Sequence, residues 1–331
     1  MHRLLGRREL ALGAIVAALF VAVGWRSPVF FSAGNLDTLL NDGAILAMMA
    51  LAQMCALLTR GVDLSVAANM ALTGMTTALV SRSHPELSVA WSLVLGLGVG
   101  LILGAINGLC IAWLELPPIV VTLGTMSIYR GLVFVLSGGA WVNAHELGPR
   151  FLAFPLQRFA GLTHLVWVAL IIAALGYVFL HHRRAGRELY ALGGNPAAAR
   201  YAGIDAPRRE FLVYALTGLL SGLCGYLWVA RYAVAYTETA LGFEMQTIAA
   251  CVIGGVSIQG GRGSVAGCLL GAAFLVVLFN ALPVIDVSPF WQSAISGAAI
   301  LTAVILNSRS ERRRGKRIRK TPLNAPVGAK A

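Results

Sequence analysis

Long apolar segments recur along the whole chain and alternate with short polar stretches. Ten of them have, or nearly have, the roughly 20 residues that a helix needs to cross a bilayer core. The eighth is short and the third follows the second almost without a loop, so tilted, broken or re-entrant helices remain open for both. The pattern predicts an all-α polytopic membrane protein of about ten transmembrane helices. The segments are 9–24, 43–59, 64–80, 89–114, 119–137, 163–180, 211–229, 245–256, 264–282 and 289–306.

The composition supports a lipid environment. Hydrophobic residues make up 58% of the 331 positions and charged residues 12%, against about 25% charged residues in a typical soluble domain. The 37 glycines suit close helix contacts in lipid. The basic start and the apolar run 10–23 are similar to a signal peptide, but Trp25 and Arg26 follow where a small-residue cleavage site would be needed. We therefore expect an uncleaved first span.

The distribution of lysine and arginine along the chain predicts its orientation in the membrane. With a cytosolic N-terminus, the cytosolic pieces hold 20 of the 26 basic residues, as the positive-inside rule requires. Both termini then lie in the cytosol. We expect a transmembrane domain over 1–308 and a basic, disordered cytosolic tail over 309–331 that faces membrane lipid rather than nucleic acid.

The polar segment 181–210 interrupts the apolar segments and contains the sequence signals for both the start and the end of a short helix. Asn195 is suited to be its N-cap, Pro196 its first residue and Gly203 its left-handed stop. A helix of roughly seven residues is marginal alone in water. We therefore expect it to dock against another protein.

The chain carries no recognisable catalytic machinery. It has no phosphate-binding GxxxxGK[ST] motif, no HExxH, no GxSxG and no paired carboxylates at helical spacing. We interpret the glycine-rich stretch 254–263 as a tight turn between two spans. His181 and His182 are adjacent and the five cysteines form no CxxC, so we expect no metal. Any ATP must then be hydrolysed by another chain.

Polar residues inside apolar segments are the candidates for a transport path, because they are costly in lipid and usually face an interior or water. Neutral amides and hydroxyls suit a neutral polyol, and each also has the simpler interpretation of bonding between helices. Asn41 and Gln53 belong to this group. The predicted path residues are Asp63, Asn69, Thr73, Asn107, Thr122, Thr125, Arg130, Glu244 and Gln246.

Four motifs in order make the chain similar to the membrane permeases of bacterial carbohydrate ABC importers, a group that includes ribose, rhamnose and autoinducer-2 permeases. They resemble the family's GIDLSVG hairpin, its PxIVTLGT…RG segment, its cytosolic coupling loop and its IAAxxxGGxSxxGGxG stretch. The segments are 61–66, 118–131, 186–204 and 248–263. Within the group, 138–141, 241–245 and 289–291 are most similar to the autoinducer-2 and rhamnose permeases.

The resemblance implies a permease of the bacterial inner membrane, with residues 1–308 as its membrane domain, and a set of partners and site residues. Two permease chains, identical or related, form the path; a periplasmic protein delivers the sugar; and two ATPase domains bind ATP and Mg²⁺. The coupling residues would be Gly193, Gly194, Asn195, Pro196, Ala198, Ala199, Arg200, Gly203 and Ile204. The cytosolic hairpin would use Gly254, Gly255, Gly260, Gly261 and Gly263.

Two departures from the family pattern leave the substrate open. Ala67 and Ala68 stand where Gly-Ser is usual, and Met245 and Gln246 stand where Leu-Asp is common. A branched-chain amino acid permease of the same superfamily remains an alternative, although it would need partners for a carboxylate and an ammonium. An ion-coupled secondary transporter and an intramembrane enzyme are weaker alternatives.

Overall fold

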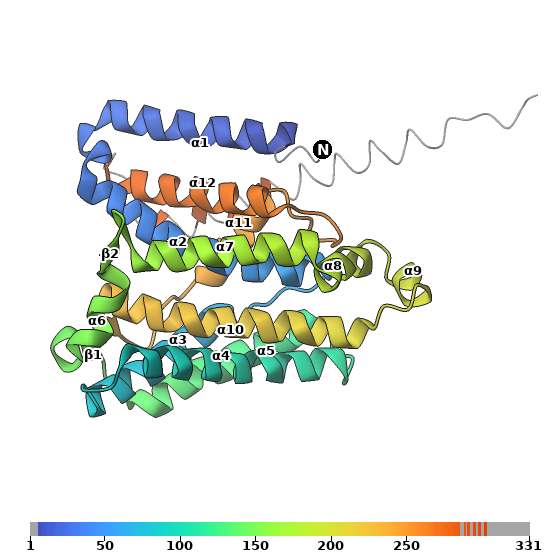
Figure 1. Cartoon of the computed structure of the whole chain (residues 1–331), viewed down its shortest axis with the longest axis horizontal. Coiled ribbons are helices and arrows are strands. Elements are labelled where there is room, and N and C mark those ends of the chain that lie inside the picture. Colours follow the sequence, from blue (N-terminus) through green and yellow to red (C-terminus); the bar gives the residue numbers. More distant parts are fainter. Residues whose placement is uncertain are drawn as a thin grey trace, which may run out of the picture.

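The computed structural model is a bundle of helices that run side by side (Figure 1). It describes residues 6–284, 288, 290–291, 294–295, 297–298 and 301–302. The long helices are α1 (Arg7–Arg26), α2 (Ala33–Leu58), α3 (Val66–Ser83), α4 (Val89–Ala112), α5 (Pro118–Ser137), α7 (His164–His182), α10 (Ala206–Tyr232) and α12 (Val265–Val284).

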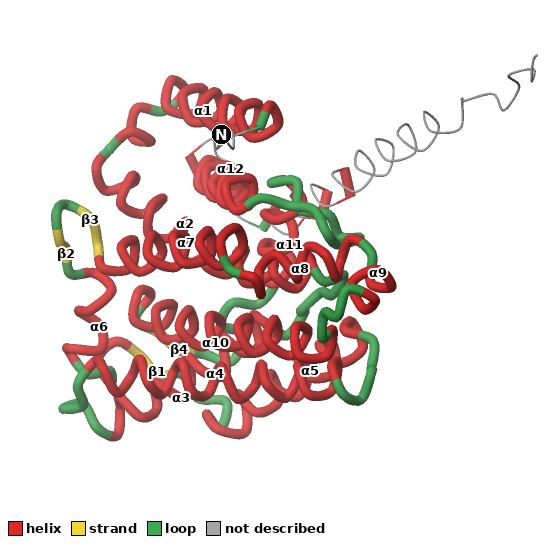
Figure 2. The backbone as a smooth tube through the Cα atoms, turned by 45° about the vertical axis from the view of Figure 1, so that its right-hand side comes forward, coloured by secondary structure: helices red, strands yellow, loops and turns green. Residues whose placement is uncertain are grey.

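Shorter elements join the long helices at the two ends of the bundle (Figure 2). One end carries α8 (Arg184–Gly194) and α9 (Pro196–Tyr201); we call it the α9 end. The opposite end carries η1 (Pro28–Phe31), η2 (Ala144–Glu146), α6 (Pro149–Leu156) and the strands β1 (Val142–Asn143), β2 (Arg158–Phe159), β3 (Leu162–Thr163) and β4 (Val234–Ala235). The strands form two antiparallel pairs, β1 with β4 and β2 with β3.

Local sequence signals explain where the helices begin. The side chains of Ser32, Thr163 and Asp205 accept hydrogen bonds from backbone N–H groups in the first turns of α2, α7 and α10, which is the usual action of an N-cap. Pro118 occupies the first position of α5, where the missing N–H of proline costs nothing. The β-branched run 119–122 is helical, because a lone strand in lipid would leave its backbone groups without hydrogen bonds.

Nine of the ten predicted segments correspond to helices, namely α1, α2, α3, α4, α5, α7, α10, α11 (Phe243–Ile253) and α12. Seven described helices are long and apolar enough to cross a membrane; α3 and α11 are not among them. The predicted segment 43–59 is too short, because α2 begins at Ala33. The segment 289–306 falls largely, and the tail 309–331 wholly, outside the described residues.

Helix α11 is too short to cross a bilayer. Its 11 residues span roughly 17 Å, against a hydrocarbon core of about 30 Å. The glycine hairpin that follows α11 reaches the α9 end, where Gly261 N–H donates to the Leu58 carbonyl at 3.0 Å. Helix α11 therefore begins part-way through the bundle, and the loop 233–242, which we call the re-entrant loop, runs back inward to meet it.

Helix α10 lies at the centre and packs against α4, α3 and α2, whereas α1 lies outermost against α12 (Figure 1). Glycines on α4 and α10 allow the backbones of the two helices to touch directly. A Cβ on Gly100 would overlap the Gly218 carbonyl, and one on Gly222 would overlap the Gly96 carbonyl. This is the small-residue packing expected between helices in lipid.

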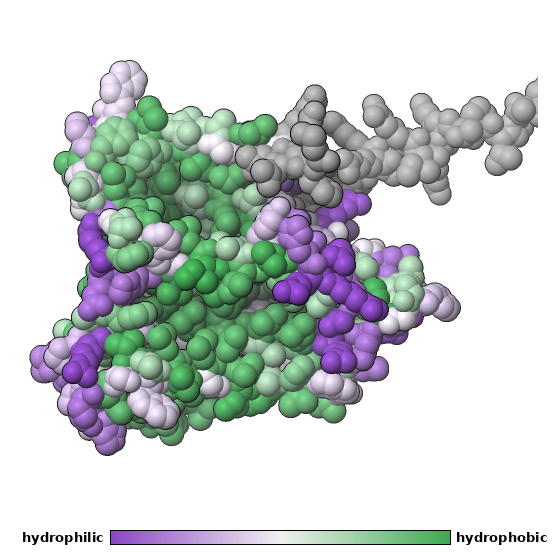
Figure 3. Space-filling model, in the orientation of Figure 1, coloured by the Kyte–Doolittle hydropathy of each residue, from purple (hydrophilic) through white to green (hydrophobic). Residues whose placement is uncertain are grey.

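The surface agrees with a membrane setting. Apolar residues cover the middle of the visible face, and polar residues gather at its two ends (Figure 3). An apolar band between polar ends is what a chain surrounded by lipid tails needs.

The α4–α10 contact gives a direct test. Gly100→Ala should destabilise the protein by about 1–3 kcal/mol, because the added methyl group has no room at the backbone of α10. Gly98→Ala is the matched control, since a Cβ there meets nothing within 4 Å. Thermal unfolding in detergent should show a lowered midpoint for Gly100→Ala and an unchanged midpoint for the control. Equal midpoints would contradict close backbone packing.

Candidate functional site

The predicted short helix is present as α9, at one end of the bundle. The Asn195 Oδ1 atom accepts a hydrogen bond from Ala198 N–H at 3.1 Å, and Pro196 follows as the first helical residue. Gly203 has a φ of +77°, which is the left-handed stop expected of glycine. Ile204 N–H donates to the Ala199 carbonyl at 3.0 Å and closes the turn.

Helix α9 has one inward and one outward face. Ala199 is 4% exposed and packs in a small cluster with Leu192 and Ala206. Arg200 and Ala198 are exposed, and Tyr201 is 94% exposed. Ala199 therefore anchors the helix from within, while the outward residues are exposed.

The turn that carries α9 is tied to the rest of the α9 end by Arg60. Its Nε donates to the Gly193 carbonyl at 2.7 Å and its Nη2 to the Gly194 carbonyl at 3.1 Å. A Cβ on Gly193 would collide with Leu58 and Gly261. The end of α8 thus lies directly against the α2–α3 turn and the α11–α12 hairpin.

The predicted hairpin glycines form the tight turn that the sequence indicated. Gly255, Gly260 and Gly261 have positive φ angles of +94°, +84° and +67°, a conformation that other residues rarely adopt. Gly254 packs directly on the backbone of Gly267 in α12. The carbonyl of residue 263 accepts from the Tyr190 hydroxyl of α8 at 3.2 Å. The hairpin is therefore part of the same packed unit as α8.

Glu188 joins α8 to the start of α10. Its Oε1 accepts from Arg184 Nε at 2.7 Å and its Oε2 from Arg209 Nε at 2.5 Å. The side chain is 10% exposed. Burial opposes its charge, but the hydrogen bonds from the two arginines outweigh burial and lower the pKa of Glu188.

Six of the predicted path residues form a buried layer near the α2–α3 turn. Asp63 is 2% exposed. Its Oδ1 accepts from the Ser65 hydroxyl at 2.6 Å and its Oδ2 from the Thr217 hydroxyl at 2.9 Å. Asn107 Nδ2 donates to Ser65 Oγ at 2.8 Å, and Thr122 Oγ1 donates to the carbonyl of residue 62 at 3.1 Å. These bonds connect the α2–α3 turn to α4, α5 and α10.

The other members of this layer also bond to protein groups. Asn69 Nδ2 donates to the Gly100 carbonyl at 3.3 Å and its Oδ1 accepts from Thr73 at 3.1 Å. Thr125 bonds to the Val121 carbonyl of its own helix. The layer is an arrangement of bonds between and within helices.

The remaining three predicted path residues lie elsewhere. Arg130 Nη1 donates to the Thr239 carbonyl at 2.7 Å and to the Thr237 carbonyl at 3.3 Å, so it supports the re-entrant loop. Glu244 lies in the first turn of α11. Gln246 lines a separate cavity.

Sequence reasoning did not select four residues that the structure brings into the site. Arg60 and Glu188 make the bonds that fix α9, Thr217 completes the Asp63 cluster, and Tyr201 projects from α9. Tyr201 had a usable signal, because a large aromatic residue ends an otherwise small alanine helix. Arg60 and Thr217 act through contacts across more than 100 positions, and Glu188 reaches Arg209 across 21 positions, for which one sequence gives no sign.

A bundle of apolar helices with a buried polar layer and a short exposed helix at one end is the architecture of a polytopic membrane protein. Residues 35–304 match the family described as the branched-chain amino acid transport system / permease component, and the chain belongs to this family. It is a multi-pass protein of the bacterial inner membrane and resembles permeases of sugar importers.

Several curated relatives match along nearly their whole length. A probable ABC transporter permease protein y4mJ of Sinorhizobium fredii is 36% identical, over 93% of this chain and 92% of the relative. The ribose import permease protein RbsC of Escherichia coli K12 is 36% identical, over 91% and 92%. The autoinducer 2 import system permease protein LsrC of an Enterobacter species is 32% identical, over 93% and 89%. No solved structure matches significantly.

The Glu188 contacts predict a pH-dependent contribution to stability. Glu188→Gln should destabilise the protein by about 1–3 kcal/mol at neutral pH, because it leaves the two arginines without their charged acceptor. The folded-state pKa of Glu188 is lowered, so this contribution is present above the usual carboxyl range and is lost as pH falls through the lowered pKa.

Thermal midpoints of wild type and Glu188→Gln, measured from pH 8 downward, should therefore converge in acid. The control is Glu86→Gln, whose side chain is 71% exposed beside His84 and should leave the midpoint unchanged. A wild-type advantage that persists at the lowest pH would contradict the assigned role.

Proposed function

We propose that this chain is the membrane-spanning subunit of an ATP-binding-cassette importer that moves a sugar or sugar-like molecule inward. The support is the full-length similarity to permeases whose names specify ribose and autoinducer 2. Ribose, autoinducer 2, rhamnose and related monosaccharides are the candidate substrates. On this proposal the chain has no enzymatic activity, a partner ATPase binds ATP and Mg²⁺, and a periplasmic protein delivers the sugar.

The α9 end carries the coupling function on this proposal. Helix α9 lies in the cytosol and enters a cleft of the ATPase, which Tyr201 and Arg200 contact. Its exposure, with its base fixed by Arg60 and Glu188, is the observation that supports the proposal. Large aromatic and arginine side chains are the residues that most often dominate protein interfaces.

The orientation of the chain in the membrane follows from the α9 end, which the proposal places in the cytosol. The start of α1 lies beside the α11–α12 hairpin, where Glu9 accepts from the Ser264 hydroxyl at 2.9 Å. The N-terminal end of α1 therefore lies at the α9 end, in agreement with a cytosolic N-terminus. A second permease chain, identical or related, completes the path.

Branched-chain amino acid import is the second candidate, favoured by the description of the matching family. Uptake by proteoliposomes that contain the permease, its ATPase and its binding protein separates the two. Labelled ribose or rhamnose should enter when ATP is supplied on the side of the ATPase, and labelled leucine should not. Leucine uptake without sugar uptake would contradict the proposal, and uptake by the permease alone would indicate a secondary transporter.

Gly203→Val tests the coupling role. The substitution forces a β-branched residue into a left-handed conformation, which costs about 1–2 kcal/mol, and should distort the turn after α9. We expect normal membrane insertion, continued ATP hydrolysis and about tenfold less uptake per ATP.

The matched control is Gly139→Val, just after α5 at the opposite end of the bundle. Gly139 has a φ of +77°, and a Cβ there, as at Gly203, meets nothing within 4 Å. The backbone strain is therefore comparable, but no coupling element is near. Equal uptake by the two variants would count against a coupling role for α9.

A further inference from the structure

A cavity of about 520 Å³ lies between α2, α10, α11, α12 and the re-entrant loop. Its size falls within the range of small-molecule sites, about 300–1,000 Å³. Asp42 comes early in α2, and Trp228 and Asn280 come late in α10 and α12. Because α10 and α12 start at the α9 end and α2 finishes there, the cavity lies in the opposite half of the bundle.

Aromatic rings form one wall of the cavity. The Trp228 ring lies 4.9 Å from Tyr232 and 5.1 Å from Phe243, centroid to centroid. Each ring therefore limits the movement of the next. A rigid aromatic wall offers a flat apolar surface, and the C–H face of a sugar ring is its natural complement.

Hydrogen-bonding groups face the same cavity. The Asp42 Oδ1 atom accepts from Tyr232 OH at 2.9 Å and from Arg231 Nη2 at 3.3 Å, and no described residue bonds to Oδ2, which can accept from a ligand hydroxyl. The Asn280 Oδ1 atom is buried and has no partner among the described residues, which is costly unless a ligand or water donates to it. The Gln246 amide adds a donor and an acceptor.

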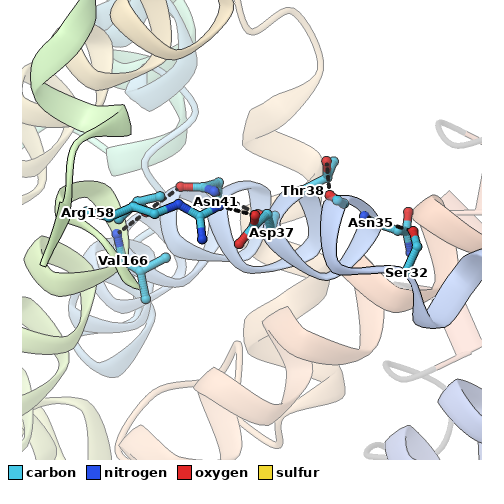
Figure 4. Close-up of polar contacts among 9 residues, drawn as sticks. Ser32, Asn35, Asp37, Thr38, Asn41, Arg158 and Val166 are labelled. Atoms are coloured by element: carbon cyan, nitrogen blue, oxygen red, sulfur yellow. Dashed lines mark hydrogen bonds and ion pairs between the residues drawn. The ribbon is translucent and has the colours of Figure 1, made fainter. Parts of the chain in front are cut away.

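Polar contacts hold the first part of helix α2, which also lines the cavity, in place (Figure 4). Asp37 forms an ion pair with Arg158, and Asn41 Oδ1 accepts from the Thr163 hydroxyl at 2.6 Å. These bonds tie α2 to the β2–β3 hairpin and the start of α7. The position of Asp42 is therefore fixed independently of any ligand, as a preorganised site requires.

The charges around the cavity limit the class of ligand. Asp42 and Glu238 both line it, whereas no lysine or arginine is among the described residues that do so. The neighbouring Arg231 is already engaged by Asp42. A phosphate or carboxylate would face acidic groups without a cation of its own, whereas a neutral polyol offers donors to carboxylate and amide oxygens.

We propose that this cavity binds one neutral, unphosphorylated monosaccharide, stacked on Trp228 and held by Asp42, Gln246 and Asn280. The proposal rests on the importer function and names the residues that select its substrate. It moves the selective site to the cavity from the Asp63 layer, whose polar groups, apart from the Asn107 Oδ1 atom, bond to one another and to backbone carbonyls. Of the predicted path residues, Gln246 alone is among the described residues that line this cavity.

The experiment uses the complete importer in proteoliposomes, with labelled D-ribose and then labelled L-rhamnose as probes. Trp228→Ala and Asn280→Ala should each lower initial uptake about tenfold at subsaturating sugar, while the importer assembles and hydrolyses ATP. Trp228→Phe keeps a stacking ring and should retain most of the uptake. Trp91→Ala is the control, because Trp91 is 63% exposed on α4 and does not line the cavity.

Competition identifies the ligand class. Unlabelled ribose should compete for uptake, whereas ribose 5-phosphate and leucine should not. Uptake by Trp228→Ala and Asn280→Ala within twofold of wild type would overturn the cavity assignment, as would competition by the phosphate. If the unaltered importer takes up leucine and neither sugar, the sugar-importer function itself fails, and the two failures are thereby distinguished.

Discussion

The structure depends on the direct backbone contact between α4 and α10. Glycines on both helices allow it, and a single methyl group at Gly100 or Gly222 would have no space. Lipid tails provide no hydrophobic drive to bring helices together, so close packing of this kind is a main source of their association. With α4 on one side and α2 and α3 on others, α10 is held along most of its length.

Helix α10 connects the two parts of the molecule to which we assign function. It has 27 residues and is therefore roughly 40 Å long. It begins at Ala206, shortly after α9, and ends at Tyr232 beside the cavity. Glu188 fixes its first turn to α8, and Thr217 fixes its middle to Asp63. A displacement of α9 by the ATPase would thus be carried by a rigid element toward the sugar cavity.

Much of this architecture could be predicted from the sequence, because its signals are local. The length of the apolar segments predicted nine helices. A capping asparagine with a following proline and glycine predicted α9, and the run of glycines predicted the hairpin turn. The predicted path residues fall into separate groups in the structure. This division could not be predicted, because apolar periodicity does not say which helices are neighbours. Asp63, Asn107 and Thr122 meet in one layer only because the α2–α3 turn packs between α4, α5 and α10. The cavity combines Asp42 and Asn280, and no local pattern joins them.

The central claim is that α9 and the sugar cavity open to opposite sides of the membrane and are joined by α10. Cysteine accessibility tests it most directly, with Ala198→Cys and Gln246→Cys each placed in a chain whose five native cysteines are replaced. A membrane-impermeant maleimide should label position 198 only from the cytosolic side and position 246 only from the periplasmic side. Labelling of both positions from the same side, or of position 198 from the periplasm, would contradict the account.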